Sequence, residues 1–123
     1  MKTDRRRRAE RRGRAMETVA ACYLMCKGYR LLARRVRLPT GELDLVVRRG
    51  NTVAFVEVKT RHDADDALRS IDRAKGRRMV DGALAWLARN VATLDGDYRF
   101  DIVVVSPYHW PRHIENAFGT ELW

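Results

Sequence analysis

Two segments in the first half of the chain, residues 43–48 and 53–59, have the apolar pattern of neighbouring β-strands. The first alternates apolar with polar positions, and the second is almost continuously apolar. A Gly-Asn pair between them predicts a two-residue hairpin turn. The turn pairs Arg49 with Thr52, and a one-residue slip would turn the apolar side chains to the opposite face, so the register is well determined.

The hairpin register places Asp44 directly opposite Glu57, near one end of both strands. Directly opposed side chains have Cβ atoms roughly 4.5–5.5 Å apart, and like charges repel at that distance. Val46 and Phe55 share this face, which predicts that protein covers it, and buried charges are costly unless paired or bound to a metal. Two interpretations stay open: solvated strand-end charges with Glu57 paired to Lys59, or a cation between the two carboxylates.

The rest of the pattern predicts a mixed α/β fold in the order αβββαβ, with one mixed sheet flanked by helices. The further elements are a helix over residues 14–27, a strand over 29–38, a helix from Ser70 to about Asn90, a strand over 98–105 and a short edge strand over 114–118. The three leading strands form an antiparallel meander. The strand–helix–strand unit that follows predicts a parallel pair.

Helical spacing places two charged residues, Glu17 and Lys75, beside the apolar stripes of the two predicted helices. Glu17 precedes Ala20, Ala21 and Leu24 at i, i+3, i+4 and i+7, so it borders a core-facing stripe. A second stripe on this helix consists of Met16, Val19, Ala20 and Tyr23. In the second helix, the residues expected to face the core are Val80, Ala83, Leu84, Leu87 and Val91, with Trp86 also assigned to the core. Lys75 adjoins that apolar stripe and is expected to point inward.

Charge is concentrated at the N-terminus of this 123-residue chain, whose length suits one domain. Eight basic residues against Asp4 and Glu10 give residues 1–14 a net charge of +6, out of +9 for the whole chain. We therefore divide the chain into a basic arm, residues 1–13, and one domain, residues 14–123. Such an arm is typical of nucleic-acid contact through phosphate neutralisation. A solvated tail and the first turns of the following helix are the alternatives.

Membrane and secretory classes do not fit the sequence. No apolar run approaches the roughly 18–20 residues that span a bilayer, and the N-terminus lacks the apolar segment of a secretory signal. Cys22 and Cys26 are the two cysteines, and we expect reduced core residues in a cytoplasmic protein that has no membrane partner. His109 and His113 lie in an irregular tail and are expected at the surface.

The order of these elements resembles a known superfamily. Asp44 on the second strand and Glu57-Val58-Lys59 on the third resemble the motif of the restriction-endonuclease-like PD-(D/E)-x-K nucleases. More narrowly, Glu17 and the segments 21–24, 28–29, 41–46 and 55–61 resemble the bacterial YraN-like family, also called uncharacterised protein family 0102. That family is related to archaeal Holliday-junction resolvases, and its own activity is largely unassigned. The resemblance covers residues 14–105.

The resemblance implies a restriction-endonuclease-like core and a metal-dependent DNA endonuclease, with branched or junction DNA among the substrates. Glu17, Asp44 and Glu57 would be acidic catalytic and metal-binding residues, with Mg²⁺ or Mn²⁺ as cofactor, and Lys59 the catalytic lysine. The candidate nucleic-acid-binding residues are Arg61, Lys75, Arg78, Arg12 and Arg14. Resolvases work as dimers, so a homodimer is one option. Arg35 stands where the family usually has asparagine, and residues 62–66 lack its usual Phe-Gly pair.

The same chemistry follows from the residues alone. Mg²⁺ prefers oxygen ligands and takes one or two carboxylates plus waters and substrate phosphate. Lys59 lies two residues past Glu57, about 6.6 Å along the same strand face, from where it can orient water or stabilise developing charge. Glu42 falls opposite Lys59 as an ion-pair partner or a catalytic group. A non-cleaving nucleic-acid-binding protein is the alternative function, and an interaction scaffold would leave the buried charges unexplained.

Overall fold

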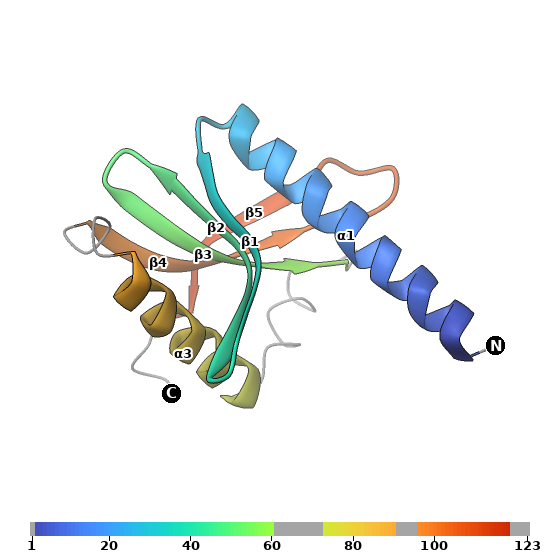
Figure 1. The fold of residues 1–123 in the computed structure, drawn as a ribbon. Helices are drawn as coiled ribbons and strands as arrows, with labels where there is room; N and C mark the ends of the chain where they lie inside the picture. Colours follow the sequence, from blue (N-terminus) through green and yellow to red (C-terminus); the bar gives the residue numbers. More distant parts are fainter. Residues whose placement is uncertain (1, 61–72, 91–95, 119–123) are drawn as a thin grey trace.

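The computed structural model describes residues 2–60, 73–90 and 96–118 and has a mixed α/β architecture (Figure 1). Its elements are α1 (Lys2–Cys26), β1 (Arg30–Leu38), β2 (Gly41–Arg49), β3 (Thr52–Lys59), α3 (Arg73–Arg89), β4 (Asp97–Val104) and β5 (Arg112–Phe118). The strands form one five-stranded sheet in the order β1-β2-β3-β4-β5. The parallel β3–β4 pair and the antiparallel β1–β2–β3 meander are as the sequence predicts, and β5 pairs antiparallel with β4.

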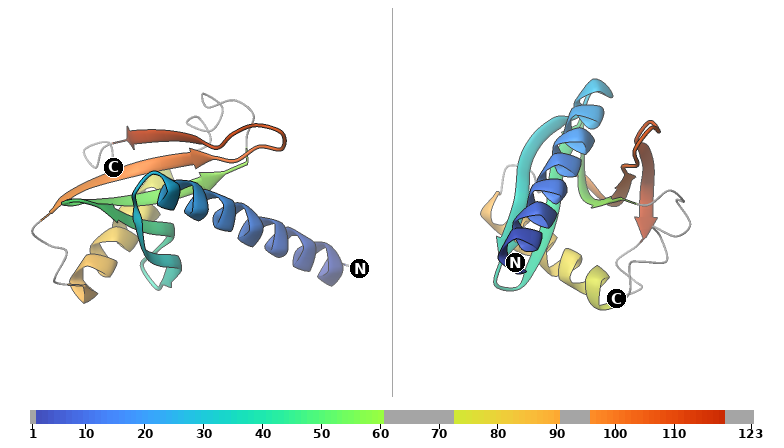
Figure 2. Two further views of the ribbon diagram at one scale, coloured as in Figure 1. Left: turned by 90° about the horizontal axis from the view of Figure 1, so that it is seen from above. Right: turned by 90° about the vertical axis from the view of Figure 1, so that its right-hand side faces the viewer.

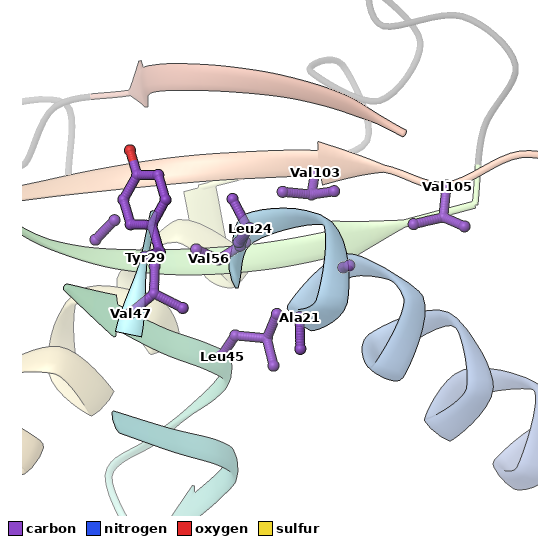
Figure 3. Close-up of a cluster of buried hydrophobic side chains, with 10 residues drawn as sticks. Ala21, Leu24, Tyr29, Leu45, Val47, Val56, Val103 and Val105 are labelled. Carbon is purple, nitrogen blue, oxygen red and sulfur yellow. The ribbon is translucent and has the colours of Figure 1, made fainter. Parts of the chain in front are cut away.

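The two helices pack on opposite faces of the sheet. Ala20, Ala21 and Leu24 of α1 join a buried cluster with Leu45 and alternate residues of the neighbouring strands (Figure 3). The opposite face is covered by α3, whose buried side chains are Met79, Ala83, Trp86 and Leu87. Trp86 makes an edge contact with Phe55, which confirms its assignment to the core. No helix in the described ranges is long and apolar enough to cross a membrane.

Several expected positions are corrected by the packing. The first helix begins at Lys2, twelve residues before the predicted start, so the basic arm is helical. Cys22 and Cys26 are free thiols but exposed, because they lie on the side of α1 that faces away from the sheet. Val19 and Leu84 are also exposed, since the packed face is centred on the neighbouring stripe in each helix. Ser70 and Val91 lie outside the described residues.

The β2–β3 hairpin has the predicted register only over part of its length. The pairing runs from Arg49 opposite Thr52 to Leu45 opposite Val56 and ends there. Beyond it, the backbone N–H of Val58 donates a 2.9 Å hydrogen bond to Oδ2 of Asp44. The Asp44 side chain thus takes the place of a ladder bond where the strands separate. The ladder therefore ends one pair before the predicted Asp44–Glu57 opposition, but the two side chains still interact, since Asp44 raises the pKa of Glu57 through its charge and a side-chain hydrogen bond.

The start of β2 packs against the backbone of α3 through glycine. A Cβ atom at Gly41 would lie 2.1 Å from the carbonyl oxygen of Arg78 and 2.4 Å from the amide nitrogen of Gly82. Neither backbone atom can rotate away, so a side chain at Gly41 must separate β2 from α3. This close approach determines where α3 lies relative to the acidic end of the hairpin.

We expect Gly41→Ala to destabilise the protein by about 2–3 kcal/mol, as overpacking typically does. Urea unfolding followed by circular dichroism measures this change. Gly13→Ala is the matched control, because a Cβ atom there meets nothing within 4 Å and alanine favours a helix interior. Equal stability of Gly41→Ala and wild type would contradict the close approach.

Candidate functional site

Three carboxylates from three elements meet at the end of the sheet where β3 finishes. Glu17 of α1 is 7% exposed and Glu57 of β3 is 4% exposed, while Asp44 of β2 is half-buried. Burial raises the pKa of Glu17 above its usual value, and the negative charge of Asp44 raises it further. Burial also raises the pKa of Glu57, and the negative charge of Asp44 raises it further. Asp44 is therefore the acid that interacts electrostatically with both of the others.

Two lysines partly compensate this negative charge. Nζ of Lys59 lies 3.4 Å from Oε1 of Glu57, and Nζ of Lys75 lies 3.6 Å from the same oxygen. Burial and the charge of Asp44 nevertheless outweigh both ammonium groups and raise the pKa of Glu57 to about 7. The other oxygen, Oε2, is buried without a hydrogen-bond partner. Glu57 thus offers an unsatisfied acceptor on one side and a lysine pair on the other.

The pH dependence of stability follows from this raised pKa. The folded pKa of Glu57 exceeds the usual value of 4.5, so the folded state binds the extra proton and loses stability as pH rises from about 4.5 to about 7. We expect Glu57→Gln, which mimics the protonated acid, to stabilise metal-free protein at pH 8 by on the order of 1–3 kcal/mol. At pH 4 the two proteins should unfold alike, and thermal unfolding in chelator measures both.

Glu42→Gln is the control of opposite sign for this experiment. The hydrogen bond from Lys75 lowers the pKa of Glu42, so its ionised form stabilises the fold above about pH 4.5. Glu42→Gln should therefore lose stability at pH 8, where Glu57→Gln gains it. A loss of stability in both variants at pH 8 would contradict the raised pKa of Glu57.

Glu42 is an ion-pair residue, with partners that differ from the predicted one. Its carboxylate lies 3.0 Å from Nζ of Lys75 and 3.1 Å from Nη2 of Arg78, and 3.9 Å from Nε of Arg37. Lys59, expected opposite Glu42, is instead paired with Glu57. Glu42 therefore ties the beginning of α3 to β2.

The predicted nucleic-acid-binding residues fall into different environments. Lys75 points inward to the acidic residues, as its helical phase predicts. Its ammonium group forms ion pairs with Glu42 and Glu57. The Arg78 side chain is 58% exposed beside this cluster, and Arg12 and Arg14 are exposed on α1. Arg61 lies outside the described residues.

The oxygen donors of this site bear on whether it can hold a divalent cation. Among the described residues, no group of three or more histidine, cysteine or carboxylate side chains is positioned to hold a metal by itself. Mg²⁺ does not require such a group, because it commonly binds one or two carboxylates and completes its shell with water and phosphate. Oε1 of Glu17 and Oε2 of Glu57 are buried without hydrogen-bond partners, and such oxygens are the hard ligands that Mg²⁺ prefers. The residues therefore fit the cation.

A second charge cluster, around the buried Asp101, lies on the β4–β5 pair and was not predicted. Asp101 is fully buried and receives hydrogen bonds from Nε of Arg99, at 2.9 Å, and from the backbone N–H of Asn116. Nε2 of His113 lies 2.7 Å from Asp101, so the surface position expected for His113 is wrong. His113 also hydrogen-bonds Lys27. The sequence contains a signal for this cluster, because Asp101 is a carboxylate inside the apolar run 100–105. Asp44 and Glu57 are recognised in the same way, as acids within apolar strands.

The sequence matches a known family over the part that carries the acidic site. A family model described as "Uncharacterised protein family UPF0102" matches residues 16–105. The chain belongs to this family. Similar members are UPF0102 proteins of Methylorubrum extorquens strain PA1, 50% identical over 95% of this chain and 91% of the relative, and of Methylobacterium radiotolerans, 48% identical over 96% and 92%. A member from Nitrobacter winogradskyi is 44% identical over 86% of this chain and 90% of its own length.

Family membership confirms the narrower of the two predicted resemblances, and the names of these relatives state no activity. The matched range contains Glu17, Asp44, Glu57 and Lys59, but it leaves out residues 1–15 and β5. The nuclease superfamily and the restriction-endonuclease-like core stay predictions. The acidic site is thus carried by the matched range, and the basic first half of α1 lies beyond it.

Arg35, the position at which the motif departs from the resembled pattern, has an unusual backbone. Its φ is 50°, in the left-handed region that asparagine adopts more readily than most other residues. This conformation accompanies a 3.8 Å approach of Nε to Oε1 of Glu17. Nη1 of Arg35 is buried without a hydrogen-bond partner. Arg35 therefore supplies a positive charge to Glu17 at the cost of backbone strain.

Proposed function

We propose that the protein is a metal-dependent endonuclease that hydrolyses phosphodiester bonds in DNA. The observation that carries this proposal is the meeting of Glu17, Asp44 and Glu57, two of them with unsatisfied buried oxygens, beside the ammonium of Lys59. Buried acids whose pKa is raised by burial and by a neighbouring carboxylate, as for Glu17 and Glu57 beside Asp44, are unfavourable for folding alone. A perturbed cluster of this kind is a candidate for chemistry rather than for stability.

Each residue then has a role that follows from its position. Asp44 and Glu57 would hold Mg²⁺ or Mn²⁺, and Glu17 would complete the shell from α1. A bound divalent cation lowers the pKa of a water ligand and polarises a phosphate oxygen. Lys59 would donate hydrogen bonds to the attacking water or to the charge that develops on the phosphate. Lys75 would keep Glu57 and Glu42 in place rather than contact the nucleic acid.

A non-cleaving nucleic-acid-binding protein is the second candidate. It is favoured by the pairing of Glu57 with both Lys59 and Lys75, which partly compensates the acid without a metal. The strong net positive charge suits both candidates, since phosphate neutralisation is common to cleavage and to binding. The unsatisfied oxygens of Glu17 and Glu57 favour the enzyme, because a binding protein has no use for them.

The test is a cleavage assay of purified protein with Mg²⁺ or Mn²⁺ on single-stranded, duplex, flap and four-way-junction DNA. We expect product with at least one substrate and none in chelator. A second readout is thermal stability, because metal binding to an acid that must lose its proton is stronger at pH 8 than at pH 6. Absence of both cleavage and metal-induced stabilisation would leave the binding protein as the better description. The homodimer stays a prediction. Preferred cleavage of the symmetric four-way junction would favour it.

A further inference from the structure

The first half of α1 is a helix without a protein surface to cover. Figures 1 and 2 show it extending past the sheet, away from the other elements. The described side chains of residues 3–8 and 10–15 are exposed, and burial begins at Met16 and Glu17. A helix that is polar on every side and packs on nothing gains no stability from burial. Its basic composition therefore requires an explanation other than folding.

Helical phase arranges the arginines of this segment in two rows. At about 100° per residue, three arginines follow one another along one flank, and three others follow a second flank roughly 125° away. The first row consists of Arg5, Arg8 and Arg12, and the second of Arg7, Arg11 and Arg14. A third side, in phase with the packed residues Glu17 and Leu24, holds Arg6, which pairs with Glu10 at 3.5 Å. The two rows thus flank the side of α1 that faces away from the core.

Two rows of cations on opposite flanks of one helix fit two rows of anions. The major groove of B-form DNA is about 12 Å wide, admits an α-helix and is bordered by two phosphate backbones. A single strand offers only one backbone, and the major groove of A-form RNA is too narrow and deep for side chains to enter. From these geometries we infer that the first half of α1 lies in the major groove of duplex DNA, with one arginine row on each phosphate backbone.

The first half of α1 leads directly to the acidic site, so a duplex bound to it lies beside that site. Glu17 follows Arg14 by three residues in the same helix, so the arm and the acid move as one rigid body. The rows span nine residue steps, about 13.5 Å at 1.5 Å per residue, equivalent to about four base pairs of duplex. The inference rests on the proposed function in taking DNA as the ligand. It adds that the substrate has a double-stranded flank on the side of the arm.

Binding is tested without cleavage, using the Asp44→Asn protein in chelator. Fluorescence anisotropy with a 20-base-pair DNA duplex is compared with an RNA duplex and a single strand of the same sequence. We expect the DNA duplex to bind at least about tenfold more tightly than either of the others. Polyglutamate is added as a competitor, and equal competition by polyglutamate and duplex DNA would make the arm a general polyanion site and overturn the groove assignment.

Replacing either arginine row by glutamine should lower the salt dependence of duplex binding. Loss of three phosphate contacts reduces the slope of log affinity against log salt by about 2.7. The matched control carries three glutamines at the exposed positions Arg30, Arg89 and Arg112, which removes the same charge away from α1. Equal slopes for a row variant and this control would mean that the arm contributes only through the net charge of the protein. That result would contradict the inference.

Substitutions at Gly13 test the effect of helical geometry on binding without changing the charge. Gly13 lies between the arm and the packed half of α1. Gly13→Ala has open space around its Cβ and preserves the helix, whereas Gly13→Pro removes a backbone donor and clashes with the preceding turn. Neither changes the charge. We expect Gly13→Pro to lose the preference for duplex DNA and Gly13→Ala to keep it, and identical binding would overturn the rigid-helix inference.

The two proposals fail separately in these experiments. Duplex preference with sensitivity to Gly13→Pro, but no cleavage of any substrate by wild type, would support the arm and contradict the endonuclease. Cleavage of single strands by wild type, with duplex binding indifferent to the rows, would support the endonuclease and contradict the arm.

Discussion

Asp44→Asn is expected to lower metal-dependent cleavage by about 10³-fold or more, which corresponds to about 4 kcal/mol of transition-state stabilisation. The asparagine oxygen can still accept the hydrogen bond from the N–H of Val58, so the separation of β2 from β3 is preserved. The variant loses the negative charge that raises the pKa of Glu17 and of Glu57. Metal affinity should therefore fall while the fold stays intact.

Stability distinguishes this loss from a damaged fold. Because Asp44 raises the pKa of both other acids, its neutral substitute relieves repulsion, and the inactive variant should be at least as stable as wild type at pH 8. Cleavage rates and urea unfolding on the same preparations measure the two effects. Asp97→Asn is the matched control, since Asp97 is exposed at the start of β4. Unchanged cleavage by Asp44→Asn would remove the central acid from the proposal.

Lys59→Met tests the second part of the same site. Methionine keeps the length of the side chain and removes its ammonium, which lies 3.4 Å from Glu57. We expect a fall in cleavage of about 10²–10³-fold with duplex binding preserved, as for the loss of one transition-state donor. A parallel loss of cleavage and binding would make Lys59 a substrate-binding residue instead.

Asp101→Asn is expected to destabilise the protein by about 3–5 kcal/mol at pH 7, although Asp101 has no role in the proposed chemistry. Asp101 is fully buried and receives hydrogen bonds from Arg99 and the backbone N–H of Asn116, with His113 also bonded to it. An asparagine cannot balance the charge of the Arg99 guanidinium, whose side chain is 18% exposed. Arg99 and the β5 residues would be left with uncompensated polar groups.

The sign of the pH dependence gives this prediction a second check. Burial by itself would raise the pKa of Asp101, but the hydrogen bonds from His113, Arg99 and the N–H of Asn116 outweigh it and lower that pKa. The stabilisation is therefore present above about pH 3.8 and is lost as pH falls through the lowered folded pKa. Urea unfolding at several pH values should show the gap between the two proteins shrinking only at acidic pH.

Glu115→Gln is the control for Asp101→Asn. Glu115 is half-exposed and lies 3.6 Å from Nη2 of Arg99 and 4.0 Å from Nη2 of Arg49, so its loss should cost less than about 1 kcal/mol. If Asp101→Asn cost no more than Glu115→Gln, the buried cluster would not hold β5 to the sheet. Both changes neutralise one acid that faces Arg99, so the contrast measures what burial and the bonds from His113 and Asn116 add at Asp101.

The sequence by itself determined the sheet and the identity of the acids. Period-two alternation around the Gly-Asn turn gave the register from Arg49–Thr52 to Leu45–Val56. Helical phase placed Glu17 on the packed side of α1, and the long crossover gave the parallel β3–β4 pair. These features depend on residues within one element or across one turn, where side-chain direction is fixed by the backbone period.

Only the tertiary structure decided which charges meet. The hydrogen bond from Val58 to Asp44, where β2 separates from β3, and the close approach of α3 to Gly41 are contained in no local pattern. The partners of Glu42 and the burial of His113 on Asp101 likewise join elements far apart in the sequence. Periodicity states which side of an element a residue takes. The distance between two charged groups on different elements depends on how the whole chain packs, and the chemistry of the acidic site depends on that distance.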